Sequence, residues 1–209
     1  LPPEGKLTNL VFMGMGEPLE NFQNVLGALE VIRSPLGLQF SNRRVTLSTA
    51  GIIPRMVELF SRPHFVQLAL SLNAATDDQR SELMPINRKY PLADLLSVCR
   101  QLPLASREKI TFEYVLIKGV NDSEEDALRV ARLLRGIPAK INLIPFNRHP
   151  QSPYQRPEDG VIHKFREVLM AKRFTTLVRQ SKGVDILAAC GQLGQRQSGE
   201  KWADKQLEG

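Results

Sequence analysis

The residue pattern with the clearest chemical implication lies at positions 10–18, where the apolar run LVFM leads into GMGEP. Gly14 and Gly16 permit positive φ and let another group approach the main chain closely, while Pro18 fixes the backbone that follows. A strand can be ended with fewer special residues than these. The pattern therefore predicts a turn against which a ligand lies.

Short polar residues also stand where other apolar runs end. Ser48 closes RRVTLST, Ser71 opens SLNA, and Asn147 ends PFN. Such side chains can bind a ligand, or they can satisfy nearby backbone groups at a strand end. Taken alone, these residues favour the second, local reading.

The chain contains two cysteines, Cys99 and Cys190, too few for a disulfide framework and consistent with a reducing compartment. Cys190 lies among small apolar residues, where a buried cysteine is more common than a nucleophile. Cys99 lies in SVCRQL, a segment of helical pattern, and is interpreted as a core residue.

Composition is that of a globular protein, with 209 residues, 42% hydrophobic and 24% charged. No apolar run is long enough for a membrane helix and the N-terminus lacks a signal pattern, so we expect a soluble cytoplasmic protein. The net charge of +6 and pI near 9.5 fit a polyanionic partner such as nucleic acid, although many proteins of this charge bind none.

Apolar runs and helical patterns alternate along the chain, which predicts βα units and a parallel sheet. The expected strands are residues 7–13, 44–49, 65–72, 109–117, 140–144 and 174–178. The expected helices are residues 22–32, 54–60, 77–83, 92–102 and 161–171, with another that begins at the capping-box sequence SEED, 123–126, and stops at Gly136.

Each expected strand has one apolar face, as in Val45 and Leu47, because strand side chains alternate. The other face is polar and carries Thr46, Ser48, Gln67, Ser71, Thr111, Glu113 and Asn142. A flat parallel sheet covered by helices on both sides would be apolar on both faces. We therefore expect a curved sheet with a polar ligand on its concave side; a sheet with one wet face is the alternative.

The segments GMGEPLEN, RRVTLSTAG, SLNA, MPINRKYP, KGVND, PFN and AACGQL occur in this order. Together they resemble the radical S-adenosylmethionine adenine C2 methyltransferases, which modify 23S ribosomal RNA and transfer RNA. The resemblance implies an α/β fold, a partial (β/α)6 TIM-like barrel whose first strand and N-terminal domain are absent from this chain. Residues 1–193 would form the core, with strands two to six and the catalytic segment, and 194–209 a flexible tail.

The resemblance also implies roles for single residues. The turn at Gly16 and Glu17 would meet the amino group of S-adenosylmethionine through its main chain. Other positions would contact the rest of the cofactor: Ser48, Ser71, Leu72, Asn73 and Asn147, the family more often having histidine at position 73. Cys190 would be methylated by one S-adenosylmethionine, and a radical from a second would activate that methyl group for addition to C2, an electron-poor carbon.

A [4Fe-4S] cluster is implied as well, held in this family by three cysteines spaced CxxxCxxC. That motif is absent from the sequence, so the cluster ligands are expected upstream, no metal ligand is assigned here, and the chain alone is expected to be inactive.

The expected partners are 23S rRNA, tRNA and an electron donor such as flavodoxin, with no membrane and a monomeric full-length protein. Two alternatives stay open: a C8-methylating resistance relative, and a non-catalytic module that binds RNA or cofactor.

Overall fold

A computed structural model describes residues 7–14, 16–62, 66–147 and 152–179. It contains one six-stranded sheet whose strands follow chain order and pair in parallel throughout. The strands are β1 (Leu10–Phe12), β2 (Val45–Thr49), β3 (Gln67–Ser71), β4 (Ile110–Leu116), β5 (Ala139–Pro145) and β6 (Thr175–Val178). All six expected strands are thus confirmed, with β1 shorter than predicted.

Six α-helices connect or follow the strands: α1 (Phe22–Arg33), α2 (Ile53–Phe60), α3 (Asp77–Leu83), α4 (Leu92–Gln101), α5 (Glu124–Leu133) and α6 (Asp159–Ala171). Two 3-10 turns, η1 (Asn42–Arg44) and η2 (Pro85–Arg88), complete the elements of the described residues. The predicted capping box is present: the Ser123 hydroxyl accepts from the Asp126 amide at 3.0 Å, and the Asp126 carboxylate accepts from the Ser123 amide at 3.3 Å.

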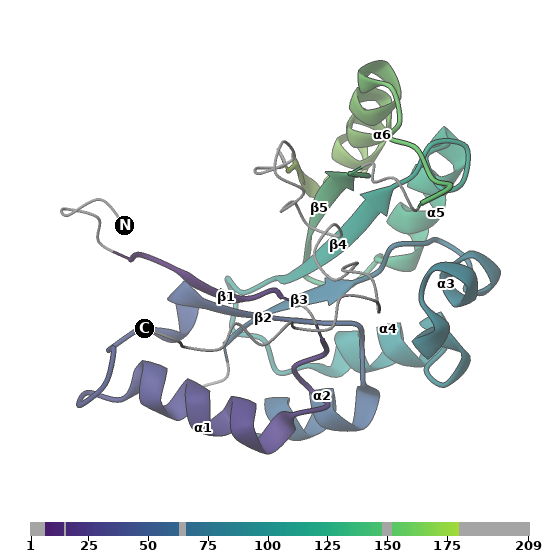
Figure 1. Cartoon of the computed structure of the whole chain (residues 1–209). Helices are drawn as coiled ribbons and strands as arrows, with labels where there is room; N and C mark the ends of the chain where they lie inside the picture. The colour runs from purple at the N-terminus through teal and green to yellow at the C-terminus, as the bar shows by residue number, and fades with distance from the viewer. Residues whose placement is uncertain (1–6, 15, 63–65, 148–151, 180–209) are drawn as a thin grey trace, which may run out of the picture.

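The helices pack against one face of the sheet. The strand residues predicted to be apolar are buried together with side chains of α1, α2, α4, α5 and α6 in a single cluster. Leu47, Leu70 and Phe112 are completely buried at its centre. Figure 1 shows α1, α2 and α4 below the sheet and α5 and α6 beside its last strands, so that no helix of the described residues covers the opposite face. The predicted division into an apolar and a polar face is confirmed.

The sheet is strongly curved, as a contact between its two edges demonstrates. A guanidinium nitrogen of Arg179, which follows β6, lies 3.7 Å from the sulfur of Met13, which follows β1. In a flat six-stranded sheet these edges would be about 24 Å apart, at about 4.8 Å between neighbouring strands. The polar face is therefore the concave face of a partial barrel, as expected.

No helix of the described residues is long and apolar enough to cross a membrane. Cys190 and the expected tail at 194–209 lie outside the described residues.

Candidate functional site

The carboxyl ends of the parallel strands form one rim of the barrel, where ligands bind in folds of this kind. The described residues predicted to bind cofactor all stand at this rim. Gly16 and Glu17 follow β1, Ser48 is in β2, and Asn147 follows β5. Ser71 ends β3, and Leu72 and Asn73 come next.

The turn after β1 is held by the side chain of Glu17. One carboxylate oxygen accepts from the Thr49 hydroxyl at 2.7 Å and from the Leu19 amide at 3.0 Å, and the other accepts from the Ala50 amide at 2.7 Å. Gly16 has φ +89° and open space where a Cβ would lie. Because the Glu17 side chain is engaged inside the protein, it leaves the exposed main chain at Gly16 open to a ligand.

Ser48 and Glu113 meet across the concave face although their strands are not neighbours. The Ser48 hydroxyl donates to the Glu113 carboxylate at 3.2 Å, bridging β2 and β4. Ala69 of β3, which pairs with Ser48 in register, lies between these two strands. Its methyl group is small enough to leave room for the bridge.

Glu113 is a buried carboxyl group with an unused acceptor. Its side chain is 7% exposed, and Oε1 has no hydrogen-bond partner among the described residues. Burial raises the pKa of Glu113, while the hydrogen bond from Ser48 and the charge of Arg179 oppose that rise. A buried acceptor without a donor is costly in a folded protein. A ligand hydroxyl or amino group on the concave face would remove this cost.

The ends of β2 and β3 are joined by a completely buried arginine, Arg80 of α3. Its guanidinium donates to the carbonyls of Ala50 (2.8 Å), Ser71 (3.1 Å) and Leu72 (3.1 Å). It also donates to the Asn87 side chain at 2.9 Å. Burial lowers the pKa of Arg80 to about 10, so it remains charged at neutral pH. Arg80 thereby fixes the backbone of two predicted cofactor-binding residues.

Asn87 belongs to the MPINRKYP segment and in turn fixes Arg80. Its amide donates to the Asp77 carboxylate at 2.8 Å and to the Ser81 hydroxyl at 2.9 Å. The Asp77 carboxylate also accepts from the Leu92 amide at 2.9 Å, which attaches the start of α4. The MPINRKYP segment therefore stabilises the rim indirectly, by holding Arg80 and the start of α4 in place.

Asn73 has a structural role in addition to its predicted one. Its φ is +58°, a left-handed conformation that asparagine and histidine adopt more readily than most residues. The side-chain oxygen accepts from the Val115 amide of β4 at 3.0 Å, and the backbone carbonyl accepts from Asn121 at 2.8 Å. This conformational requirement explains why asparagine fits this position.

Asn121, in the KGVND segment, is completely buried and joins the ends of β3 and β4. Besides the Asn73 carbonyl, its amide donates to the Val115 carbonyl at 2.8 Å, and its oxygen accepts from the Ile117 amide at 2.7 Å. Sequence reasoning did not identify Arg80 or Asn121 as residues that build the site. Glu113 was placed on the polar face but was not included among the site residues.

The rim fits S-adenosylmethionine in its chemistry. The cofactor offers amino and hydroxyl donors, and the site offers the Glu113 oxygen, the Ser48 and Ser71 hydroxyls and the main chain at Gly16. It does not fit an iron–sulfur cluster by itself. The sequence has two cysteines, fewer than the three of the cluster motif, and the described residues include no group of three potential metal ligands.

The fold and rim define a partial-barrel protein with a polar ligand site at the carboxyl ends of its strands. The chain belongs to the radical SAM superfamily, whose sequence profile matches residues 3–131. Membership implies S-adenosylmethionine and a [4Fe-4S] cluster as cofactors.

Two curated relatives have the name dual-specificity RNA methyltransferase RlmN. The protein of Desulfosudis oleivorans is 56% identical over 92% of this chain and 52% of its own length. That of Geobacter sulfurreducens is 56% identical over 88% of this chain and 51% of its own length. The chain thus spans about half the length of the curated relatives it matches.

A solved structure of a radical SAM methyltransferase from Sphaerobacter thermophilus superimposes with a TM-score of 0.86 at 45% identity. The match covers 90% of this chain and 55% of that one. The predicted fold is therefore confirmed.

Proposed function

We propose that this chain is the cofactor-binding and methyl-carrying part of an RNA methyltransferase that acts on C2 of adenosine in 23S rRNA and tRNA. The observation that carries the proposal is the 56% identity over 194 residues with a relative named as a dual-specificity RNA methyltransferase. The polar rim of the barrel supports it, because its open groups complement those of S-adenosylmethionine.

In this proposal the main chain at Gly16 accepts hydrogen bonds from the cofactor amino group, while Glu17 holds the turn in place. Ser48, Ser71, Leu72, Asn73 and Asn147 contact the rest of the cofactor. Glu113 joins this set, because its free oxygen accepts a hydrogen bond from a cofactor hydroxyl or amino group. Arg80 and Asn121 position these groups without touching the ligand.

Cys190 carries the methyl group on its sulfur before transfer to the RNA. S-adenosylmethionine, when bound with its cluster, supplies the methyl group and a carbon radical. A radical route is needed because C2 of adenine lies between two nitrogens and is too electron-poor to attack a methyl sulfonium. Cys99 takes no part, since it lies on the buried side of α4 and its thiol is enclosed in the core.

The cluster ligands, in this proposal, come from sequence outside these 209 residues, because a three-cysteine motif is not among them. The chain alone would then produce no methylated RNA, even after reconstitution with iron and sulfide. The complete enzyme would work as a cytoplasmic monomer with an electron donor such as flavodoxin.

The test is nucleoside mass spectrometry of 23S rRNA and tRNA. Host cells that lack their own adenosine C2 methyltransferase receive the complete gene of which this sequence encodes a part, either unchanged or with Cys190→Ala or Cys99→Ala. We expect 2-methyladenosine in both RNAs with the unchanged gene and with Cys99→Ala, and none with Cys190→Ala.

Two results would reject the proposal in different ways. Formation of 8-methyladenosine would replace it with the resistance-type activity. Absence of any methylated adenosine, with folded protein and an intact cluster present, would favour a non-catalytic binding module.

A further inference from the structure

The two ends of the barrel differ in charge. The connections that lead into the amino ends of β2 to β6 contain one acidic residue, Glu108, and many basic ones: Arg43, Arg44, Arg62, Arg107, Lys109, Arg135, Lys172 and Arg173. At the carboxyl ends, the connections contain both signs in similar number: the acidic residues Glu17, Glu20, Asp122 and Glu158, and the basic residues Arg88, Lys89, Lys118, Arg148 and Arg156. The positive charge therefore gathers at the end opposite the cofactor site.

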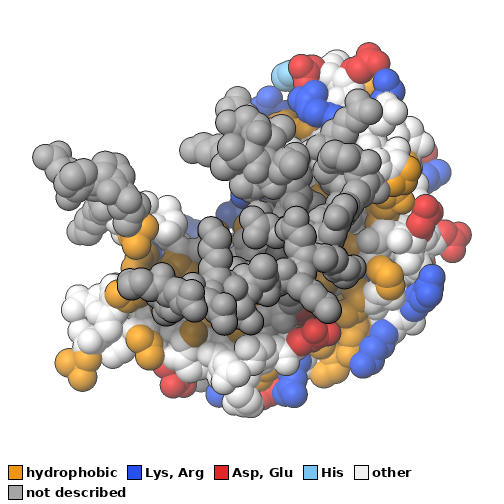
Figure 2. All heavy atoms as spheres, in the orientation of Figure 1, with side chains coloured by type: hydrophobic (Ala, Val, Ile, Leu, Met, Phe, Trp, Pro, Cys, Tyr) orange, Lys and Arg blue, Asp and Glu red, His pale blue; other side chains and the backbone are white. Residues whose placement is uncertain are grey.

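This arrangement does not extend to the outer helices, where arginines and acidic residues alternate. Arg55 pairs with Glu58 on α2, and Arg129 and Arg132 pair with Glu125 on α5. Figure 2 shows blue and red side chains interspersed along the helical edge of the molecule.

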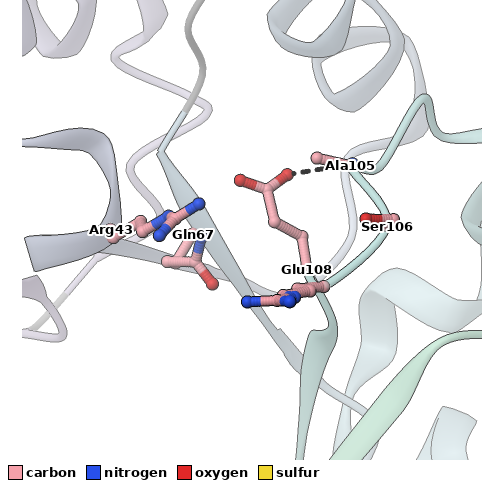
Figure 3. Close-up of a pocket in the computed structure, with 6 residues that line it drawn as sticks. Arg43, Gln67, Ala105, Ser106 and Glu108 are labelled. Carbon is pink, nitrogen blue, oxygen red and sulfur yellow. Dashed lines mark hydrogen bonds between the residues drawn. The ribbon is translucent and has the colours of Figure 1, made fainter.

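A cavity of about 550 Å³ lies at the basic end, between the segments that precede β2 and β4. Its lining comprises Arg43, Gln67, Ala105, Ser106, Arg107 and Glu108. Figure 3 shows Arg43 and Gln67 on one side and the loop with Ala105, Ser106 and Glu108 on the other. The Glu108 carboxylate accepts from the Ala105 amide at 3.2 Å.

The two arginines of this cavity are available to a ligand. Both are exposed, and neither forms a hydrogen bond or an ion pair with any residue in the described part of the chain. Glu108 also lines the cavity, but its carboxylate is not within ion-pair distance of either arginine. Two guanidinium groups beside a hydroxyl and an amide form a donor set suited to phosphate oxygens.

Interaction with helix ends explains some of the basic residues at this end of the barrel, but it does not explain Arg43 and Arg107. Arg135, Lys172 and Arg173 follow the last turns of α5 and α6 closely, where a cation offsets the partial negative charge of the helix end. Arg43 and Arg107 are separated from the ends of α1 and α4 by extended loops. The helix-end effect, which fades beyond the last turn, does not account for them.

We propose that the cavity between Arg43 and Arg107 binds the phosphate backbone of the RNA, as a second contact remote from the base that is modified. This inference rests on the proposed RNA methyltransferase function. The strands of five to seven residues separate the two sites by roughly 20 Å, from about 3.3 Å per residue. A folded RNA with several helices spans that distance, whereas a short single strand at the cofactor rim does not.

RNA fits this cavity better than an acidic protein does. Guanidinium groups bind phosphate oxygens in a bidentate manner, and a phosphate with its ribose can enter a recess of this volume. A carboxylate-bearing protein surface would meet the exposed basic side chains without filling the recess.

The test measures how salt affects RNA binding by the full chain. A fluorescently labelled transfer RNA is titrated by anisotropy between 50 and 300 mM KCl, with unchanged protein and with the double variant Arg43→Gln/Arg107→Gln. The matched control is Arg55→Gln/Arg129→Gln, which removes the same charge from the outer helices α2 and α5. All three proteins are compared by circular dichroism to establish equal folding.

Loss of two phosphate contacts should make the negative slope of log K against log[salt] less steep by about 1.4 to 1.8. It should also weaken binding by about tenfold or more at 100 mM salt. The control should change the slope by less than 0.5, an order-of-magnitude bound from the same counterion argument. If both double variants had the same slope, the change would be due to net charge and not to these two positions, and the proposal would be overturned. An unchanged slope for Arg43→Gln/Arg107→Gln would overturn the proposal directly, because it would show that neither arginine contacts a phosphate.

The outcome is separable from that of the proposed function. If the enzyme methylates RNA but the Arg43/Arg107 variant keeps the original salt slope, the second contact is wrong and the activity stands. If the slope falls but no methylated adenosine forms, the contact stands and the activity is wrong.

Discussion

Replacement of Arg80 by methionine provides the most direct test of how the cofactor rim is built. Methionine fills much of the same space but donates no hydrogen bonds. The carbonyls of Ala50, Ser71 and Leu72 and the side-chain oxygen of Asn87 would each lose a donor in the protein interior.

The magnitude follows from these contacts. Each buried acceptor left unsatisfied costs about 1–3 kcal/mol, and release of the buried charge offsets part of the sum. We therefore expect a loss of about 3–5 kcal/mol in the free energy of unfolding, as for other broken buried networks. Since domains are stable by about 5–15 kcal/mol, the variant would fold but with a small margin.

Urea unfolding at pH 7, followed by circular dichroism, measures this loss. Arg80→Lys keeps the charge but cannot span the four acceptors, so it should lie between wild type and Arg80→Met. Arg62→Gln, an exposed residue just after α2, should change stability by no more than about 0.5 kcal/mol. A loss below about 1 kcal/mol for Arg80→Met would refute the reasoning that this guanidinium holds the strand ends.

Three further predictions concern single side chains. Because burial raises the pKa of Glu113, its neutral form stabilises the fold below the unfolded-state pKa of about 4.3, and this contribution is lost as pH rises through the native pKa. The urea midpoint of Glu113→Gln should therefore exceed that of wild type near neutral pH and equal it near pH 4. A difference in midpoint that does not change with pH would contradict this. Glu17→Ala should lose about 1–3 kcal/mol in thermal unfolding, since three donors lose their acceptor, whereas Glu20→Ala, an exposed neighbour, should not. Burial raises the pKa of the Cys99 thiol to about 12, so iodoacetamide at pH 8 should alkylate Cys99 only when urea has unfolded the protein. Peptide mapping would detect the alkylated residue. Labelling of Cys99 in the folded protein would disprove its assignment to the core.

The sequence predicted the elements well because local patterns determine them. Alternation placed Leu47 on the covered face and Ser48 on the other, and both assignments hold. The SEED segment predicted the capping box at Ser123 because that motif is complete within four residues. The shorter β1 reflects the extent of its pairing, which begins at Leu10 opposite Val45.

The supports of the site were not predictable, since their partners are distant in sequence. Arg80 stands in DDQRSEL, which reads as an exposed polar helix, and its burial depends on carbonyls from two strands. Glu113 meets Ser48 only because β3 places a small residue, Ala69, between them. Asn73 was identified through family resemblance, whereas its bond to Val115 depends on where β3 ends relative to β4.

The order of the strands has a consequence for how the chain folds. Each strand pairs with the next one made, and no later strand inserts between earlier ones. Each pairing still closes one crossover connection, from 21 residues between Thr46 and Gln67 to 42 residues between Ala69 and Thr111, which is slower than pairing across a hairpin. During synthesis, β1 and β2 can therefore pair before β4 has left the ribosome, and the sheet grows at one edge as the chain emerges.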